Sequence, residues 1–351
     1  MEADRRLRSA HWLMRAETQA LMALLDGAAG RTRAVGGTVR DTIMDMLRPD
    51  AEVDLATELL PEEVMQRAQR AGVGAHPTGI EHGTVTLVAG GLMAEVTTLR
   101  EDVETYGRRA RVRFGTDWRR DAERRDFTMN ALYASMDGSL FDPIGGLEDC
   151  LGRRVRFIGD AHQRIEEDHL RVYRFFRFSA SHGNGARGEF DAVGLEACRR
   201  TAGELAGVSP ERIGHEMVRI LSLPICAPVI LAMVETGVLP IGLEGVAALA
   251  ACEQLAGGCS LAGRLALIGG DDAGLAGLKE RWRLSNDMIA RARHVLELAP
   301  LLKGNDVAAA IVLHGDEVAG ALAPAAVIGG RGAGWLEATR RELDRLVGLR
   351  A

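Results

Sequence analysis

The spacing of apolar residues along the chain changes near residue 145. Before that point, short apolar runs that suit strands alternate with stretches whose apolar residues recur every three or four positions, as helices require. The predicted elements are a helix at 16–26, a strand at 33–37 ending in a glycine turn, a helix at 38–48, a strand at 51–57, a helix at 60–72 beginning at Pro61, and a hairpin at 84–99 that turns at Gly90 and Gly91. This order predicts a small mixed sheet with flanking helices.

After residue 145 the pattern is helical almost throughout. Helices are predicted near 160–180, 191–204, 208–222, 226–237, 243–256, 276–298 and 335–348. The Gly/Ala-rich stretch 319–334 is only weakly periodic, and we interpret it as a mobile connection. We therefore expect an α/β head at residues 1–145, an all-helical neck at 146–205, and an all-helical body and tail at 206–351.

Composition places the chain among ordinary globular proteins, because 47% of its 351 residues are hydrophobic and 26% are charged. No apolar run approaches the ~20 residues that a membrane helix needs, and the charged N-terminus lacks the apolar centre of a secretory signal. The five cysteines are odd in number and lack C-x-x-C spacing, so we expect reduced thiols. The expected compartment is the cytoplasm.

The net charge of −6 does not favour a nucleic-acid partner, but the distribution of arginine does. Residues 100–177 hold sixteen arginines and no lysine. Part of this excess is attributed to genomic base composition, since Lys279 and Lys303 are the only lysines of the whole chain. Arginine nevertheless pairs bidentately with phosphates and base edges, so the arginine-rich stretch indicates such ligands.

A glycine turn joins the first predicted strand to the helix after it. Gly36 and Gly37 leave backbone N–H groups bare, and Arg40 follows one helical turn later. Such a turn often only redirects the chain. Because an acidic strand that could bind metal follows it in the sequence, it is also suited to holding a phosphate.

Three acids, Asp50, Glu52 and Asp54, occupy every second position of the next strand. Side chains of an extended chain alternate, so the three share one face, and residues two apart lie ~6.5–7 Å from each other. Asp50 and Asp54, at ~13 Å, are too far apart to share an ion, which leaves Glu52 with either of them. Glu95 on the predicted hairpin is placed to add a carboxylate. On spacing alone, a solvated edge strand explains the three acids more often than a metal site does. For Glu95, a position on the solvent face is as frequent as a role in the site.

Arg125 and Asp126 precede a predicted amphipathic helical run at 127–132. A charged pair there suits a triphosphate and a ribose hydroxyl, respectively. Spacing alone equally allows Asp126 to be a helix cap beside a solvated arginine.

Segment 166–178 predicts one helix with charges on one side and aromatic residues on the others. Asp168 and Arg171 are neighbours at i and i+3, and Arg174 and Arg177 continue the step. We interpret the helix as buried, with its charges directed toward a ligand rather than forming a surface salt-bridge ladder. An Asp–Arg pair accepts from an exocyclic amino group and donates to a ring acceptor, a combination that cytosine and adenine match but uracil and guanine do not.

Six motifs in order resemble the class II tRNA nucleotidyltransferase and bacterial poly(A) polymerase family: "VGGTVRD", "EVDLAT", "EVTTLREDVET", "RRDFTMNAL", "DPIGGLEDC" and "EDHLRVYRFFRF". The match covers residues 33–180, and residues 207–221 resemble the family's RNA-binding helices. The resemblance implies a nucleotidyltransferase-like head, CTP and ATP as substrates, the tRNA 3′ end as partner, pyrophosphate as product and two Mg²⁺ ions as cofactors.

In the register of this family, Glu52 and Asp54 fall on the metal-binding catalytic pair, and Glu95 is a further catalytic carboxylate. Asp168 and Arg171 fall on the pair that reads the base, so that the protein itself selects CTP and then ATP. The residues implied in nucleotide binding are Gly36, Gly37, Arg40, Arg125, Asp126, Asp168, Arg171, Arg174 and Arg177.

Two positions depart from the family pattern: Glu52 stands where Asp is usual, and Tyr106 stands where a loop usually has an acid. The chain lacks the basic G-R-[RK]-F stretch typical of polyadenylating members between the metal strand and Arg125, which favours CCA addition. A-only addition or poly(A) synthesis is the first alternative. A non-catalytic RNA-binding protein with a decayed head is the second, and a nucleotidyltransferase acting on a small molecule or a protein, which leaves the long helical region unexplained, is the third.

Overall fold

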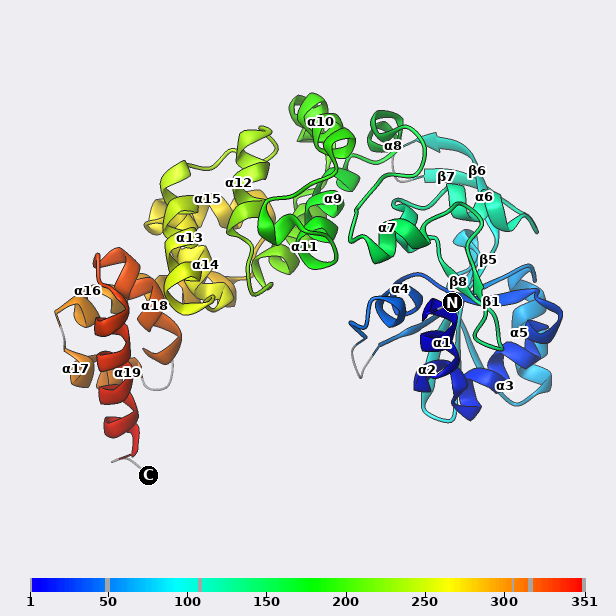
Figure 1. The fold of residues 1–351 in the computed structure, drawn as a ribbon, viewed down its shortest axis with the longest axis horizontal. Helices are drawn as coiled ribbons and strands as arrows, with labels where there is room; N and C mark the ends of the chain where they lie inside the picture. Colours follow the sequence, from blue (N-terminus) through cyan, green and yellow to red (C-terminus); the bar gives the residue numbers. More distant parts are fainter. Residues whose placement is uncertain (1, 48–50, 107–108, 305, 315–317, 349–351) are drawn as a thin grey trace. The chain divides into compact units, whose positions relative to one another are not determined.

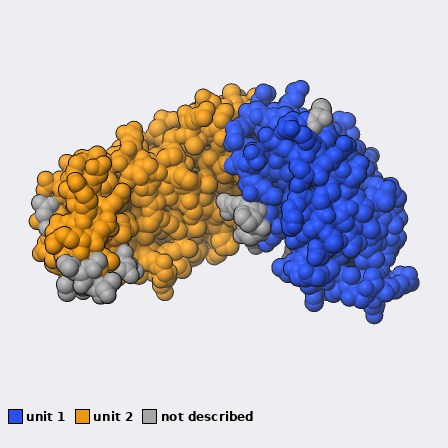
Figure 2. All heavy atoms as spheres, turned by 60° about the horizontal axis from the view of Figure 1, so that its bottom comes forward, with its two compact units in different colours: residues 1–168 blue, residues 169–351 orange. Residues whose placement is uncertain are grey.

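The computed structural model describes residues 2–47, 51–106, 109–304, 306–314 and 318–348. The chain forms two compact units, Met1–Asp168 and His169–Ala351 (Figure 1; Figure 2). The first contains a mixed sheet with helices, and the described part of the second is built from helices, which confirms the predicted fold class. The finer division into head, neck and body stays a prediction.

The sheet of the first unit has seven strands in the order β3-β4-β5-β2-β1-β8-β9. Their bounds are β1 Thr32–Val35, β2 Val53–Thr57, β3 Gly74–Gly79, β4 Thr84–Ala89, β5 Leu92–Thr98, β8 Tyr133–Ala134 and β9 Leu140–Phe141. β2 runs parallel to β5, whereas the other neighbouring pairs are antiparallel. Strands β6 Arg100–Tyr106 and β7 Arg109–Phe114 form a separate hairpin (Figure 1).

Helices accompany this sheet, and local chemistry explains several of their ends. Their bounds are α1 Glu2–Arg8, α2 His11–Met14, α3 Ala16–Leu24, α4 Gly37–Ile43, α5 Pro61–Arg70, α6 Trp118–Glu123, α7 Leu147–Leu151 and α8 Ala161–Glu167. Pro61 opens α5 at a position whose N–H would lack a helical partner in any case. Asp45 (φ 58°) is left-handed just after α4, so α4 ends at Ile43 rather than near residue 48 as predicted. Gly90 (φ 56°) and Gly91 (φ 80°) form the predicted turn between β4 and β5.

The amphipathic helix predicted at 127–132 is wrong. The chain makes a single 3₁₀ turn, Thr128–Asn130, and then enters β8. The Thr128 N–H donates to the Arg156 carbonyl (3.0 Å), and an isolated β-bridge joins the same two segments. Long-range pairing has therefore overridden a local helical pattern.

The single helix predicted across 166–178 is also wrong. α8 ends at Glu167, Asp168 is extended (φ −153°, ψ 102°), and the next helix begins at Leu170. Asp168 and Arg171 therefore do not lie one turn apart on a common helix. The break coincides with the boundary between the two compact units.

The second unit is helical, as predicted. Its helices are α9 Leu170–Ser181, α10 Ala192–Thr201, α11 Pro210–Leu221, α12 Ala227–Glu235, α13 Leu243–Ala256, α14 Leu261–Gly269, α15 Asp272–Trp282, α16 Asn286–Lys303, α17 Val307–His314, α18 Val318–Ile328 and α19 Ala333–Gly348. The helix predicted at 276–298 is divided, because left-handed Arg283 (φ 48°) ends α15 and the Ser285 side chain caps α16. Among the described residues, no helix is both long enough and apolar enough to cross a bilayer.

Stretch 319–334 is not the connection we predicted, because most of it forms α18. Val318, Ala321, Leu322 and Ala325 are at most 2% exposed. They belong to a hydrophobic cluster that includes side chains of α13, α14 and α16. Alanine adds little to a hydrophobic periodicity, so a closely packed helix of this composition gives a weak pattern in the sequence.

Candidate active site

Asp54 and Glu95 lie beside each other on the parallel pair β2–β5. They are direct partners in its register, so both side chains project from one face of the sheet. Burial raises the pKa of Asp54 to about 6, Glu95 and then Glu52 push it in the same direction, and Arg125 opposes them. A carboxylate whose charge is disfavoured by its neighbours gains from a bound cation.

Glu52 precedes β2 and is exposed. Its backbone carbonyl accepts a hydrogen bond from the Thr38 hydroxyl of α4, which ties the acid strand to the helix after the glycine turn. Its carboxylate raises the pKa of Asp54 less than Glu95 does. Asp50 lies outside the described residues. The acids that the structure brings together are therefore Asp54 and Glu95, with Glu52 beside them.

The glycine turn meets both Asp54 and Arg125. Gly36 has φ 80° and ψ −133°, a conformation that side chains with a β-carbon rarely adopt. A β-carbon at Gly36 would lie 3.9 Å from Asp54 Oδ2 and 3.9 Å from Arg125 Nη1. One at Gly37, the first residue of α4, would lie 3.7 Å from Arg40 Nη2. The glycine turn thus lies close to the Asp54 carboxylate and to the guanidinium groups of Arg40 and Arg125.

Arg40 is buried, and neighbouring side chains hold its guanidinium. Its Nη1 donates to Asn130 Oδ1 (2.6 Å), and its Nη2 forms an ion pair with Asp41 (2.7 Å). Asn130 Nδ2 donates in turn to Asp126 Oδ1 (3.0 Å). One amide therefore links two predicted nucleotide-binding residues. The sequence analysis missed Asn130, whose only signal is its place within the motif "RRDFTMNAL".

Arg125 is held by two residues that the sequence analysis also missed, Asp121 and Tyr133. Its Nε donates to the Tyr133 hydroxyl (3.3 Å), and its Nη2 lies 3.3 Å from Asp121 Oδ2. Burial by itself would lower the pKa of Arg125, but Tyr133 and Asp121 outweigh burial and raise it. Burial would likewise raise the pKa of Asp121, but Arg125 and Arg124 prevail and lower it. Both groups therefore stay charged at neutral pH.

Arg171, Arg174 and Arg177 lie on α9 of the second unit. Arg177 forms an ion pair with the buried Glu216 of α11, and Arg174 Nη1 lies 4.0 Å from the same carboxylate. The Arg177 guanidinium also lies 4.1 Å from the centre of the Phe178 ring. Burial lowers the pKa of Arg177, although Glu216 opposes the change. These contacts join α9 to α11, and the nucleotide-binding role of Arg174 and Arg177 stays a prediction.

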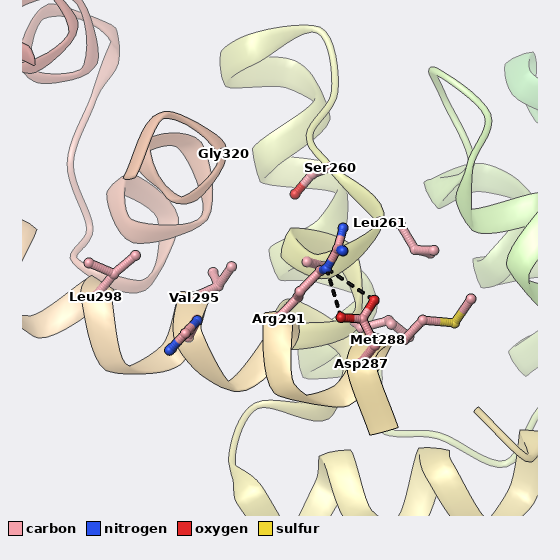
Figure 3. Close-up of a pocket in the computed structure, with 11 residues that line it drawn as sticks. Ser260, Leu261, Asp287, Met288, Arg291, Val295, Leu298 and Gly320 are labelled. Carbon is pink, nitrogen blue, oxygen red and sulfur yellow. Dashed lines mark hydrogen bonds and ion pairs between the residues drawn. The ribbon is translucent and has the colours of Figure 1, made fainter. Parts of the chain in front are cut away.

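A pocket of about 430 Å³ lies among α14, α16 and α18 of the second unit (Figure 3). Its lining combines apolar side chains such as Leu261 and Val295 with the ion pair of Asp287 and Arg291 (3.1 Å). Among the residues described around it, none is a predicted site residue. We therefore place the candidate active site at Asp54, where carboxylates and a guanidinium meet, rather than at this pocket.

The acid pair fits a divalent cation such as Mg²⁺. This ion prefers oxygen ligands and is commonly held by one or two carboxylates together with water and substrate phosphates. Over the described ranges of the chain, no three His, Cys, Asp or Glu side chains gather into a metal site. Asp54 and Glu95 therefore suit an ion that is shared with a phosphate-bearing substrate.

Two family models match this chain. Residues 32–156 match the poly A polymerase head domain, and residues 190–249 match the probable RNA- and SrmB-binding site of polymerase A. Over these ranges the chain therefore resembles a poly A polymerase head followed by a probable RNA-binding site. The first match contains the predicted site residues from Gly36 to Asp126.

The curated relatives of this chain indicate a more specific activity than the family models do. The chain is 46% identical over 192 residues to the CCA tRNA nucleotidyltransferase 1, mitochondrial, of Danio rerio, a match covering 54% of this chain and 43% of that protein. It is 38% identical over 205 residues to the CCA-adding enzyme of Geobacillus stearothermophilus, covering 58% of this chain and 48% of that protein. These matches span about half the length of the curated relatives.

Solved structures resemble almost the whole chain. The Bacillus stearothermophilus CCA-adding enzyme in complex with CTP is 28% identical, with a TM-score of 0.72 over 95% of this chain and 84% of that chain. A tRNA nucleotidyltransferase complexed with a primer tRNA and an incoming ATP analog shares the fold, with 20% identity and a TM-score of 0.70 over 95% of this chain and 99% of that one. The resemblance to the class II tRNA nucleotidyltransferase and poly(A) polymerase family is confirmed.

Proposed function

We propose that the protein is a template-independent nucleotidyltransferase that adds C, C and A to the 3′ end of tRNA, using CTP and ATP and releasing pyrophosphate. The observation that carries the proposal is the meeting of Asp54, Glu95 and Arg125 at the Gly36 turn. Paired carboxylates beside a guanidinium suit nucleotidyl transfer, because they hold cations and a triphosphate together. The CCA-adding enzymes among the matched relatives support this choice of reaction.

In this proposal Glu52 and Asp54 would hold the two expected Mg²⁺ ions, as the family register implies, and Glu95, which pairs with Asp54 across β2 and β5, would add a carboxylate. Bound ions of this kind lower the pKa of an attacking hydroxyl and neutralise a triphosphate. The 3′ oxygen of the tRNA forms a bond to the α-phosphorus of the nucleotide, the bond from that phosphorus to the bridging oxygen breaks, and pyrophosphate leaves. Arg125 helps to keep Asp54 charged, because it lowers the pKa that burial and the other acids raise.

The triphosphate is assigned to the glycine turn with Arg40 and Arg125, and the ribose to Asp126. The Asp126 carboxylate accepts from the Phe127 N–H (2.9 Å) and from Asn130 (3.0 Å), so its orientation is set before a nucleotide binds.

The base is assigned, from the family register alone, to Asp168 and Arg171, whose side chains supply an acceptor and donors of the kind that the amino edge of cytosine or adenine requires. Selection requires that the wrong base leave polar groups unpaired, which is costly in a site closed to water.

The second unit is assigned to RNA. Its matched region, residues 190–249, includes Arg199 and Arg200 on α10, with 54% and 67% of their side chains exposed. Helices with exposed arginines suit recognition of the tRNA backbone and shape rather than its sequence.

The test is incubation of the whole chain with a tRNA lacking its last three nucleotides, with Mg²⁺ and each labelled nucleoside triphosphate, singly and mixed. CTP alone should add two residues, CTP with ATP should complete the end, and UTP or GTP should add none. Asp54→Ala should abolish incorporation.

Other outcomes replace the proposal with a stated alternative. Incorporation of A alone, or of long A tails, would support A-only addition or a poly(A) polymerase. Retained tRNA binding with no incorporation would support a non-catalytic RNA-binding protein. Incorporation that survives Asp54→Ala would move the catalytic site elsewhere.

For the compartment we propose the cytoplasm, as expected from the sequence. The Danio rerio relative is named as a mitochondrial protein, so fractionation of cells expressing the tagged chain decides between the two compartments.

A further inference from the structure

Arg125 is the guanidinium that faces Asp54, and side chains behind it set its direction. Its Nη1 lies 3.9 Å from the place of a β-carbon at Gly36, while its Nε and Nη2 contact Tyr133 and Asp121. We propose that Asp121 and Tyr133 are positioning residues that hold Arg125 for contact with the triphosphate of the incoming nucleotide. This inference rests on the proposed function, because it assigns the ligand of Arg125.

Asp121 divides its two oxygens between different partners. It is 1% exposed, and its Oδ1 pairs with Arg124 Nη2 (2.7 Å). Its Oδ2 accepts from the Tyr133 hydroxyl (2.8 Å) and lies 3.3 Å from Arg125 Nη2. A buried carboxylate is stable only when it is well paired. Arg124 supplies much of that pairing, so the second oxygen can act as an oriented acceptor for Arg125.

The Tyr133 hydroxyl is fixed because its ring is fixed. Tyr133 is fully buried, and its ring packs edge-on against Trp118 (5.4 Å between centres, 89°) and against Phe141 (6.1 Å). On the sheet, Tyr133 of β8 pairs with Val35 of β1, the residue before Gly36. The hydroxyl that holds Arg125 and the turn that Arg125 faces are therefore built on adjoining strands.

The backbone that carries Arg125 is held as well. Arg164 of α8 donates from Nη2 to the carbonyl oxygens of Arg124 (2.5 Å) and Arg125 (2.7 Å). With main chain, Nε and Nη2 all engaged, Arg125 loses little conformational freedom when a ligand arrives. A guanidinium ordered in advance binds a phosphate group more tightly than a mobile one.

Tyr133→Phe tests the inference, because it removes the hydroxyl and keeps the ring. Binding of CTP and of CMP to the whole chain is measured by calorimetry, together with the melting temperature. We expect CTP to bind about 5- to 20-fold more weakly, as for a lost hydrogen bond that orients a charged group. CMP, which lacks the β- and γ-phosphates, should change less than about twofold. A purely structural role for the hydroxyl would weaken both ligands alike, and that result would overturn the inference.

A double-mutant cycle with Arg125→Ala identifies the route of the effect. If Tyr133 acts through Arg125, Tyr133→Phe should cause no further loss of CTP affinity in the Arg125→Ala protein. Full additivity would overturn the inference. Arg119→Gln is the matched control, since it removes an exposed ion pair with Glu123 from α6, the helix that carries Asp121: it should leave CTP affinity within about twofold. Absence of CTP binding by the unmodified chain would instead contradict the proposed function.

Discussion

At the scale of single residues, Asp54 dominates the electrostatics of the candidate site. Burial, Glu95 and Glu52 raise its pKa from 3.8 to about 6. The Asp54 carboxyl group therefore binds its proton more tightly in the folded protein than in the unfolded chain. It follows that the contribution of Asp54 to stability is largest at low pH, falls as pH rises between these two values, and stays low above them.

Asp54→Asn should stabilise the metal-free protein at pH 7.5 while abolishing nucleotide incorporation. The neutral amide removes the charge that burial and Glu95 disfavour, so we expect the free energy of unfolding to rise by about 1–2 kcal/mol. Denaturant unfolding in EDTA measures it. The difference should shrink as the pH is lowered from about 6 and should nearly vanish only below 3.8, where Asp54 is protonated in both the folded and the unfolded chain. A variant that is less stable than the wild type at pH 7.5 would contradict the raised pKa.

Glu52 can be tested by its length. Because its side chain is exposed, neither Glu52→Asp nor Glu52→Ala should change the free energy of unfolding by more than about 0.5 kcal/mol. In its proposed role as a metal ligand, however, it requires a carboxylate. Incorporation should therefore fall at least about tenfold in Glu52→Ala and recover in Glu52→Asp, with the Mg²⁺ concentration for half-maximal rate rising in Glu52→Ala alone. If both variants incorporated nucleotides as fast as the wild type, Glu52 would not be a metal ligand.

At the scale of elements, prediction succeeded where local chemistry decides the outcome. Pro61 at the start of α5 and the paired glycines between β4 and β5 act through their own backbone preferences, which neighbours do not alter. It failed where distant contacts decide. Segment 127–132 has a helical pattern but pairs instead with residues near Arg156. Helix α18 was not predicted, because its alanines pack closely in the core but contribute little to a hydrophobic periodicity.

The packing of α18 into the core can be tested with a matched pair of variants. Ala321 is fully buried and Ala319 is exposed on the same helix, so both can be changed to arginine. Ala321→Arg forces a charge into the hydrophobic cluster and should lower the free energy of unfolding by more than about 2 kcal/mol. Ala319→Arg should stay within about 0.5 kcal/mol of the wild type. Circular dichroism during urea unfolding measures both. Equal, small effects would favour the mobile connection that we first predicted.

At the scale of the whole molecule, the candidate site combines residues that sequence motifs reveal with residues that only the fold brings near. Asp54 and Arg125 stand in short ordered motifs, so their roles could be predicted from their neighbours in sequence. Asp121 lies four residues before Arg125, a helical spacing, whereas Tyr133 stands on β8 and meets Arg125 only after the sheet has formed. The hydrogen bond between Arg125 and Tyr133 follows no spacing rule, because the pairing of strands sets its distance.

The proposed assignment of RNA to residues 190–249 predicts that tRNA binding and nucleotide binding can be changed separately. Replacing Arg199 and Arg200 together by glutamine removes two exposed charges from the matched RNA-binding region. Each contact between an arginine and a phosphate releases counterions, so we expect the double variant to bind tRNA more weakly. The plot of the logarithm of the tRNA association constant against the logarithm of salt concentration should also be less steep, by about 1–2 in its slope. CTP affinity should not change.

The matched control for this charge loss is replacement of Arg5 and Arg8, which are exposed on α1 of the first unit and lie outside both family matches. It removes the same net charge, so a loss of tRNA affinity that is equal in both double variants would mean that only the overall charge matters. A loss confined to Arg199 and Arg200 would assign the tRNA backbone to α10. If neither double variant altered the salt slope, the arginines that hold tRNA would have to lie outside these two helices.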